Sequence, residues 1–158
     1  MTGKTHIAAG LAASIALGMN APQIALAAFG SLLPDVDHSG STLGKFIKPI
    51  SRHIRHRGVT HSLIFLVLST FISPYLGLGV LTHIVLDLFN PKGVELFYPW
   101  KKNIKVPIIS RFIKTNGIIE NLILTLLIIS IVLMVVFYPD LWGYKNMFDF
   151  TTLWFPIK

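Results

Sequence analysis

Residues 118–137, with the sequence IIENLILTLLIISIVLMVVF, decide the fold class of this chain. The stretch is 20 residues long, and Glu120 is its only ionisable side chain. A helix of this length reaches about 30 Å, which matches the hydrocarbon core of a bilayer. The stretch therefore predicts one complete membrane-spanning helix.

The composition of the rest of the chain agrees with this prediction. The 158 residues are 53% hydrophobic and only 13% charged, whereas a soluble domain has roughly 25% charged residues. A soluble fold of this size cannot bury so much apolar surface, and disorder is excluded for the same reason. We expect a membrane protein with a single domain over residues 1–158, in which 1–120 bear the motifs and 118–158 form the last span and tail.

Four shorter apolar segments precede the span. They cover residues 7–19, 22–33, 63–72 and 75–89, and tight turns join them in pairs. The first two have 13 and 12 residues and reach only about 20 Å as helices, so either polar flanks lengthen them or each hairpin dips in without crossing. The predicted fold is an all-α, membrane-embedded bundle of about five helices, with two short helical hairpins and one full-length span.

The N-terminal apolar segment resembles a signal peptide, with Ala25, Ala27 and Ala28 as a cleavage-like pattern. Its charged region holds only Lys4, and Asn20 and Pro22 interrupt the apolar run. We therefore interpret this segment as part of the mature protein.

The basic residues indicate the orientation. Net charge is +7, and 12 of the 14 basic residues lie at one end of the predicted helices, namely Lys4, Lys45, Lys48, Arg52, Arg55, Arg57, Lys92, Lys101, Lys102, Lys105, Arg111 and Lys114. The positive-inside rule places this end in the cytoplasm, which gives a multi-pass protein of the cell (inner) membrane with a cytoplasmic N-terminus. Topology accounts for the positive charge, so no nucleic-acid partner is expected.

Histidine and carboxylate side chains gather at the same end of the predicted helices. The candidates are His6, Asp35, Asp37, His38, His56, His61, His83, Asp87 and Glu120, contributed by five separate segments. Ionisable groups in or near a membrane are costly and are functional candidates by default. Their convergence from five segments favours one shared site.

Each motif taken alone also has a simpler interpretation. His83 and Asp87 are four residues apart on one helix face, where they can hold a cation or form a helix salt bridge. Asp35, Asp37 and His38 follow a helix end, where carboxylates oppose the helix dipole, so either a metal ion or nearby arginines would compensate them. His56 and His61 also fit an interfacial basic loop.

Metal chemistry is favoured by the donor types. The chain has no cysteine, which removes thiolate sites and leaves His, Asp and Glu as ligands. Such ligands suit zinc, manganese or iron. Mixed His and carboxylate ligands with an open position are typical of catalytic metal sites.

Several motifs together resemble a known family. They are Thr5-His6, Leu33-Pro34-Asp35-Val36-Asp37-His38, His56-Arg57-Gly58-Val59-Thr60-His61-Ser62 and Thr82-His83-Ile84-Val85-Leu86-Asp87. The combination is similar to the YdjM-like, LexA-regulated, membrane-bound metal-dependent hydrolases over about the first 120 residues. That family is distantly similar to zinc-dependent phospholipases C and single-strand zinc nucleases, which are helical proteins with three zinc ions.

The resemblance implies a metal site and roles for its residues. His83 and Asp87 match the HxxxD pair of the zinc enzymes, whereas Asn116 stands where their HxxxE pair has its histidine before Glu120. Two or three zinc ions are thus expected, with two favoured. Asp35, His61, His83 and Asp87 lead as ligands, followed by His6 and Glu120. Asp37 is expected to bridge metals or act as general base, and Arg57 to neutralise phosphoryl charge.

These expectations define a membrane-bound, metal-dependent hydrolase of phosphoesters in lipid or membrane-proximal substrates. The alternative is a non-catalytic metal-binding membrane protein, either a metal transporter or a protein with a structural site. A transporter would hold its ligands near the bilayer midplane, whereas the candidates here lie at one edge. A structural site would be closed, which the sequence does not test.

Overall fold

The computed structural model describes residues 1–41, 44–45, 58–107 and 109–137, and its regular structure is helical. Within these residues the α-helices are α1 (Gly3–Ala16), α2 (Ala21–Gly30), α4 (Leu63–Ile72), α5 (Pro74–Leu88) and α6 (Ile118–Phe137). Short 3-10 helices are η1 (Pro34–Asp37), η2 (Val59–His61) and η3 (Ile109–Arg111). One isolated antiparallel bridge joins Val94 to Ile104. The predicted all-α fold with five helices is confirmed.

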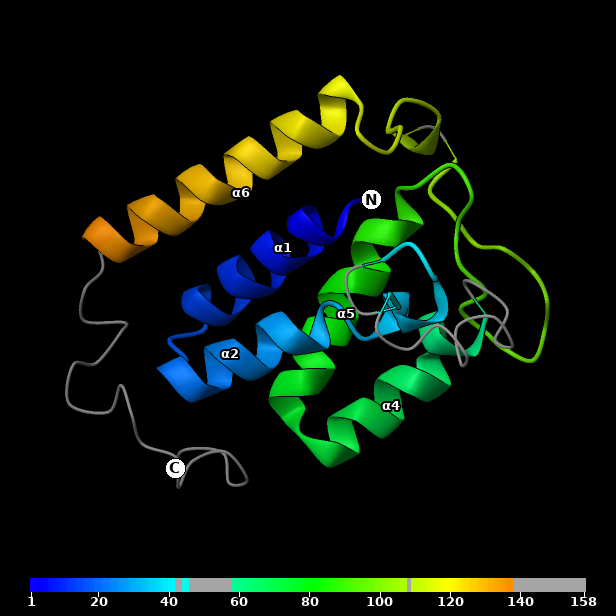
Figure 1. Cartoon of the computed structure of the whole chain (residues 1–158), viewed down its shortest axis with the longest axis horizontal. Coiled ribbons are helices and arrows are strands. Elements are labelled where there is room, and N and C mark those ends of the chain that lie inside the picture. Colours follow the sequence, from blue (N-terminus) through cyan, green and yellow to red (C-terminus); the bar gives the residue numbers. More distant parts are fainter. Residues whose placement is uncertain (42–43, 46–57, 108, 138–158) are drawn as a thin grey trace.

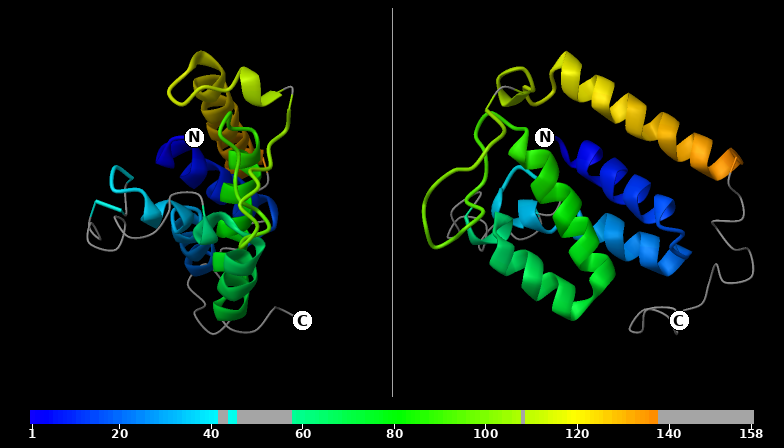
Figure 2. Two further views of the ribbon diagram at one scale, coloured as in Figure 1. Left: turned by 90° about the vertical axis from the view of Figure 1, so that its right-hand side faces the viewer. Right: turned by 180° about the vertical axis from the view of Figure 1, so that it is seen from behind.

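The helices form two hairpins and one long helix beside them. Helix α1 packs against α2, α5 and α6, while α5 also packs against α2 and α4. Helix α6 lies along the outer side of α1, and α4 lies at the opposite edge (Figure 1). The helical body is broad in this view and narrow after a 90° turn (Figure 2, left).

The chain direction gives the molecule two distinct ends. One end collects the first residues of α1, α4 and α6 and the last residues of α2 and α5, whereas the turns of both hairpins lie away from it (Figure 1). The candidate residues that the structure describes lie at the first of these ends, called the site end below.

Polar side chains fix the opposite end of the hairpins. Asn20 and Gln23 form a reciprocal capping box at the start of α2, which satisfies backbone donors that a helix start leaves free. The Gln23 amide also donates to the Tyr75 hydroxyl on α5 at 2.8 Å. This buried hydrogen bond ties the two hairpins together near their turns.

Small residues let α2 and α5 approach each other closely. A Cβ added at Gly79 would lie 2.1 Å from the Ala27 carbonyl oxygen, and one at Gly30 would lie 2.4 Å from the Leu76 carbonyl oxygen. Both distances are below van der Waals contact, so glycine is required at these two positions. The close approach brings the end of α2 against the site-bearing part of α5.

Apolar side chains cover the two outer edges of the fold. Most side chains of α6 are exposed, and on α4 the Phe71 side chain is 85% exposed. Among the described residues, α6 alone is long and apolar enough to cross a membrane, since α4 and α5 have 10 and 15 residues. The described helices thus provide one candidate span, and the expected multi-pass arrangement gains no support from them.

Candidate metal centre

Five of the nine candidate residues come together at the site end. His6 lies on α1, Asp35 on η1, His61 on η2, and His83 and Asp87 on α5. The side chains of all but Asp35 are buried. Four segments that are distant in sequence therefore contribute to one cluster of imidazole and carboxylate groups.

Asp35, His61 and His83 form the first ligand group. The His83 and His61 Nε2 atoms are 3.2 Å apart, and Asp35 Oδ1 lies 3.7 and 3.9 Å from them, respectively. Two ligands of a tetrahedral zinc ion with bonds of roughly 2.1 Å are about 3.4 Å apart. The separations in this triangle are close to that value, so the three atoms fit the ligand shell of one ion.

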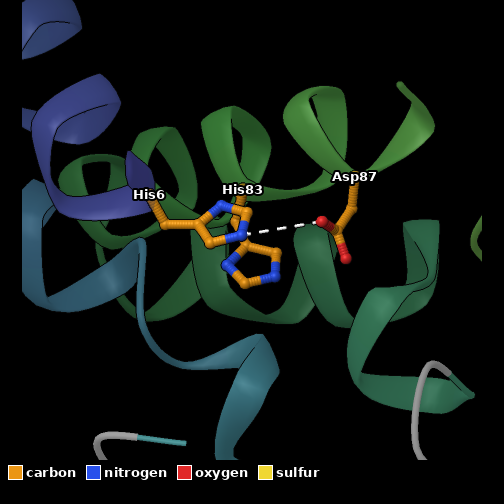
Figure 3. Close-up of side chains that lie close together, drawn as sticks. All are labelled: His6, His83 and Asp87. Carbon is orange, nitrogen blue, oxygen red and sulfur yellow. Dashed lines mark ion pairs between the residues drawn. The ribbon is translucent and has the colours of Figure 1, made fainter. Parts of the chain in front are cut away.

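His6, His83 and Asp87 form a second group that shares His83 with the first. The rings of His6 and His83 stack with centroids 3.7 Å apart, and His6 Nε2 points toward Asp87 Oδ1 at 3.6 Å (Figure 3). The other oxygen, Asp87 Oδ2, lies 3.7 Å from His61 Nε2. The carboxylate of Asp87 thus faces both groups, which is the position of a bridging ligand.

The His6 imidazole gives an independent indication of a missing partner. Its side chain is fully buried, yet neither ring nitrogen has a hydrogen-bond partner within the described part of the chain. Leaving a buried polar atom unsatisfied costs about 1–3 kcal/mol. A metal ion bound by Nε2 would satisfy one of these nitrogens, so the residues present fit a metal.

Hydrogen bonds fix the orientation of the two other histidines. His83 Nδ1 lies 2.7 Å from the Ser31 carbonyl oxygen, which can only accept, so Nδ1 carries the proton and Nε2 offers a lone pair to the cluster. The Thr60 hydroxyl donates to Asp37 Oδ2 at 2.5 Å and lies 3.1 Å from His61 Nδ1. Partners of this kind orient metal-binding histidines and fix their tautomer.

Burial also keeps two of the imidazoles neutral. It lowers the pKa of His83 to about 4, and it lowers the pKa of His6 well below the ordinary value, with His83 nearby as a further cause. Histidine binds metals only in its neutral form. Both rings are therefore in the form that a metal requires at neutral pH.

Positive charge reaches the cluster from the N-terminus. The Met1 amino group donates to Asp87 Oδ1 at 2.9 Å, and the contact is buried. An ammonium at this distance favours the ionised carboxylate. One oxygen of Asp87 is therefore engaged in a buried ion pair beside the histidines.

Glu120 serves a different structural purpose. Its carboxylate accepts hydrogen bonds from the Thr2 backbone N–H at 2.5 Å, the Thr5 hydroxyl at 2.9 Å and the Asn116 backbone N–H at 2.7 Å. It belongs to neither ligand group among the described residues. Glu120 caps the start of α1 and joins it to the start of α6, which positions His6 one turn later.

The remaining candidates lie away from the cluster or outside the described residues. Asp37 is buried behind His61, 3.6 Å from Nδ1, and is in neither ligand group. The His38 side chain is exposed and accepts a hydrogen bond from the Gly40 backbone N–H at 3.2 Å. His56 and Arg57 lie outside the described residues.

The residues that support the ligands were not predicted from the sequence. Thr60 precedes His61 directly, and Thr2 and Thr5 flank the start of α1, so their hydroxyl groups were visible as neighbours of candidate ligands. No local sequence pattern predicts the contact of the Ser31 carbonyl with His83, because the two residues are 52 positions apart.

The fold and cluster define a class, namely helical proteins with one candidate membrane span and a candidate metal centre at one end of two hairpins. The family model described as "YdjM inner membrane protein" matches residues 1–143. This chain belongs to that family.

Named relatives agree with this assignment. The chain is 32% identical over 143 residues to "Uncharacterized protein YvsG" of Bacillus subtilis (strain 168), a match covering 78% of this chain and 88% of that protein. It is 38% identical over 97 residues to "Inner membrane protein YdjM" of Escherichia coli (strain K12), covering 49% of this chain and 50% of that protein. The protein of that name from Shigella flexneri matches equally. No solved structure matches the chain.

Proposed function

We propose that this chain is a metal-dependent hydrolase of the inner membrane that cleaves phosphoesters in lipid or membrane-proximal substrates. The observation that carries the proposal is the triangle of Asp35, His61 and His83, whose ligand atoms have the spacing of a tetrahedral metal shell. The inner-membrane location rests on the family and on the printed names of the Escherichia coli and Shigella relatives.

The donor set fits two divalent ions, with zinc favoured and manganese or iron as alternatives. Asp35, His61 and His83 would hold one ion, and His6 and Asp87 would contribute to a second. When bound, such ions polarise phosphoryl oxygens and acidify water, which is the chemistry that phosphoester hydrolysis needs. The distant resemblance to zinc-dependent phospholipases C that the sequence motifs suggest would imply the same reaction class.

The protein residues keep one side of the cluster open. The Asp35 side chain is 17% exposed, whereas the other four members are at most 1% exposed. A structural metal site is closed by four protein ligands, and a catalytic site leaves a position for water or substrate. Access through Asp35 therefore favours catalysis over the purely structural alternative.

Asp37 is assigned a positioning role within this proposal. It accepts a hydrogen bond from the Thr60 hydroxyl beside His61 Nδ1 and lies on the side of His61 away from the ligand triangle. From there it fixes the orientation of the His61 ring. The expected role of Arg57 in neutralising phosphoryl charge remains a prediction from sequence.

For the membrane, we propose that α6 crosses while the two hairpins dip in from the cytoplasmic side. At 1.5 Å per residue, α1 and α5 reach only about 21–22 Å. The apolar outer faces of α4 and α6 would contact lipid, and the basic residues near the site end place that end and the N-terminus in the cytoplasm. The metal centre then lies at the depth of lipid headgroups.

The test is hydrolysis by purified full-length protein in detergent, loaded with zinc or manganese. We expect turnover of a generic chromogenic phosphodiester or of a phospholipid, its loss with chelator, and its loss in His83→Ala. Lys102→Gln, an exposed change outside the cluster, should retain activity. A metal-loaded wild type without turnover on a broad phosphoester panel would contradict the hydrolase and support the non-catalytic alternative.

A further inference from the structure

A cavity opens beside the cluster at the site end. Its volume is about 340 Å³, and its walls include Thr2, Asp35, His38, Lys45, Lys92 and Thr115. Asp35 also belongs to the first ligand group. The cavity therefore leads directly to the one partly exposed member of the cluster, and it is the route by which a substrate can reach it.

The charges of the cavity wall are unbalanced. Lys45 and Lys92 are both exposed, and neither ammonium has an ion-pair partner among the residues that the structure describes. Among the described residues of the wall, Asp35 is the only one with a carboxylate, and it faces His61 and His83. Two unpaired ammonium groups beside a candidate metal centre attract an anion.

The described wall of the cavity is not built for a cationic headgroup. Among the residues that the structure describes, no aromatic ring of Phe, Tyr or Trp lines it, whereas quaternary ammonium groups are recognised by cages of such rings. Its volume lies at the small end of the ligand-pocket range of roughly 300–1,000 Å³. A compact anionic group fits this space, and a whole lipid does not.

We propose that this cavity binds the phosphate group of an anionic phosphoester, with Lys45 and Lys92 contacting phosphate oxygens. The proposal deepens the proposed hydrolase function, on which its assignment of a substrate rests. It selects phosphomonoesters and other anionic phosphoesters over zwitterionic, choline-bearing ones. The phosphate can belong to a lipid headgroup or to a soluble molecule, and the binding chemistry is the same.

The test measures inorganic phosphate binding by calorimetry on zinc-loaded full-length protein in detergent. Lys45→Gln and Lys92→Gln should each weaken binding about tenfold, as expected for loss of one charge-assisted contact, and zinc content should not change. Lys102→Gln is the matched control, because this exposed lysine is outside the cavity wall. Phosphate binding by the double variant Lys45→Gln/Lys92→Gln with wild-type affinity would overturn the proposal.

Competition then separates the two sources of phosphate. Displacement of bound phosphate by dihexanoyl phosphatidic acid identifies a lipid headgroup, and displacement by glycerol 3-phosphate alone identifies a soluble phosphoester. Either result supports the proposal. Equal displacement by dihexanoyl phosphatidylcholine would overturn the selectivity for anionic groups.

These experiments distinguish failure of the proposed phosphate site from failure of the proposed hydrolase function. Phosphate binding that depends on the two lysines, without turnover, would contradict the hydrolase function and support the proposed phosphate site. Turnover together with phosphate binding that is unchanged in both lysine variants would contradict the proposed phosphate site and support the hydrolase function.

Discussion

Glu120 Oε1 accepts a hydrogen bond from the backbone N–H of Thr2 at 2.5 Å, across 118 residues of sequence. The contact fixes the start of α1 against the start of α6, and the carboxylate sits where the positive end of the α1 dipole favours an anion. Helix α6 therefore sets the position of the helix that carries His6.

Glu120→Gln tests whether this residue is a structural clamp or a metal ligand. The amide replaces one acceptor oxygen with a donor that faces backbone N–H groups, so we expect a loss of about 1–3 kcal/mol of stability. Thermal unfolding in detergent should shift downward while bound metal stays at the wild-type level. Asn121→Ala, an exposed change in the next position, is the control. Loss of metal without loss of stability would instead make Glu120 a ligand.

Thr60→Val tests the support behind His61. The change removes the hydroxyl that links Asp37 to His61 Nδ1 and keeps the side-chain shape. Loss of such a partner typically weakens metal affinity about 10- to 100-fold, which competition with a fluorescent zinc chelator can measure. Thr60→Ser keeps the hydroxyl and should restore affinity. Equal affinity in Thr60→Val and wild type would mean that His61 needs no orienting partner.

Membrane topology can be tested with single cysteines, because the chain has none. A cysteine at Ser39 should react from the cytoplasmic side, and one at Thr151, in the tail outside the described residues, should react from the other side. Leu17 lies at the α1–α2 turn and is exposed, so a cysteine there should be shielded by lipid from impermeant reagents on both sides. Labelling of Leu17→Cys from outside would show that the first hairpin crosses the membrane.

The helices were predictable from the sequence because apolar runs mark them. The fifth segment was expected at residues 118–137 and is α6 in full. The first was expected from residue 7, whereas α1 begins at Gly3, because Glu120 satisfies the backbone of a polar stretch that an apolar pattern does not include. Such long-range capping has no local signal.

The candidate site was predictable as a layer but not in its detail. Helix ends at one side of a bundle must meet, so the gathering of His6, Asp35, His61, His83 and Asp87 followed from topology. Which residues touch depends on side-chain contacts, such as the stacking of His6 on His83. His38, only three residues after Asp35, follows the last residue of η1 and is exposed.

The zinc content of the purified protein shows directly whether the cluster holds metal. Full-length protein purified in detergent, loaded with zinc and freed of excess metal, should retain stoichiometric zinc by mass spectrometry. His83→Ala removes the residue shared by both ligand groups and should strip most of the zinc while the protein still inserts and extracts normally. His38→Ala, an exposed histidine outside both groups, should retain it. Full zinc retention in His83→Ala, or no zinc in the wild type, would contradict the account.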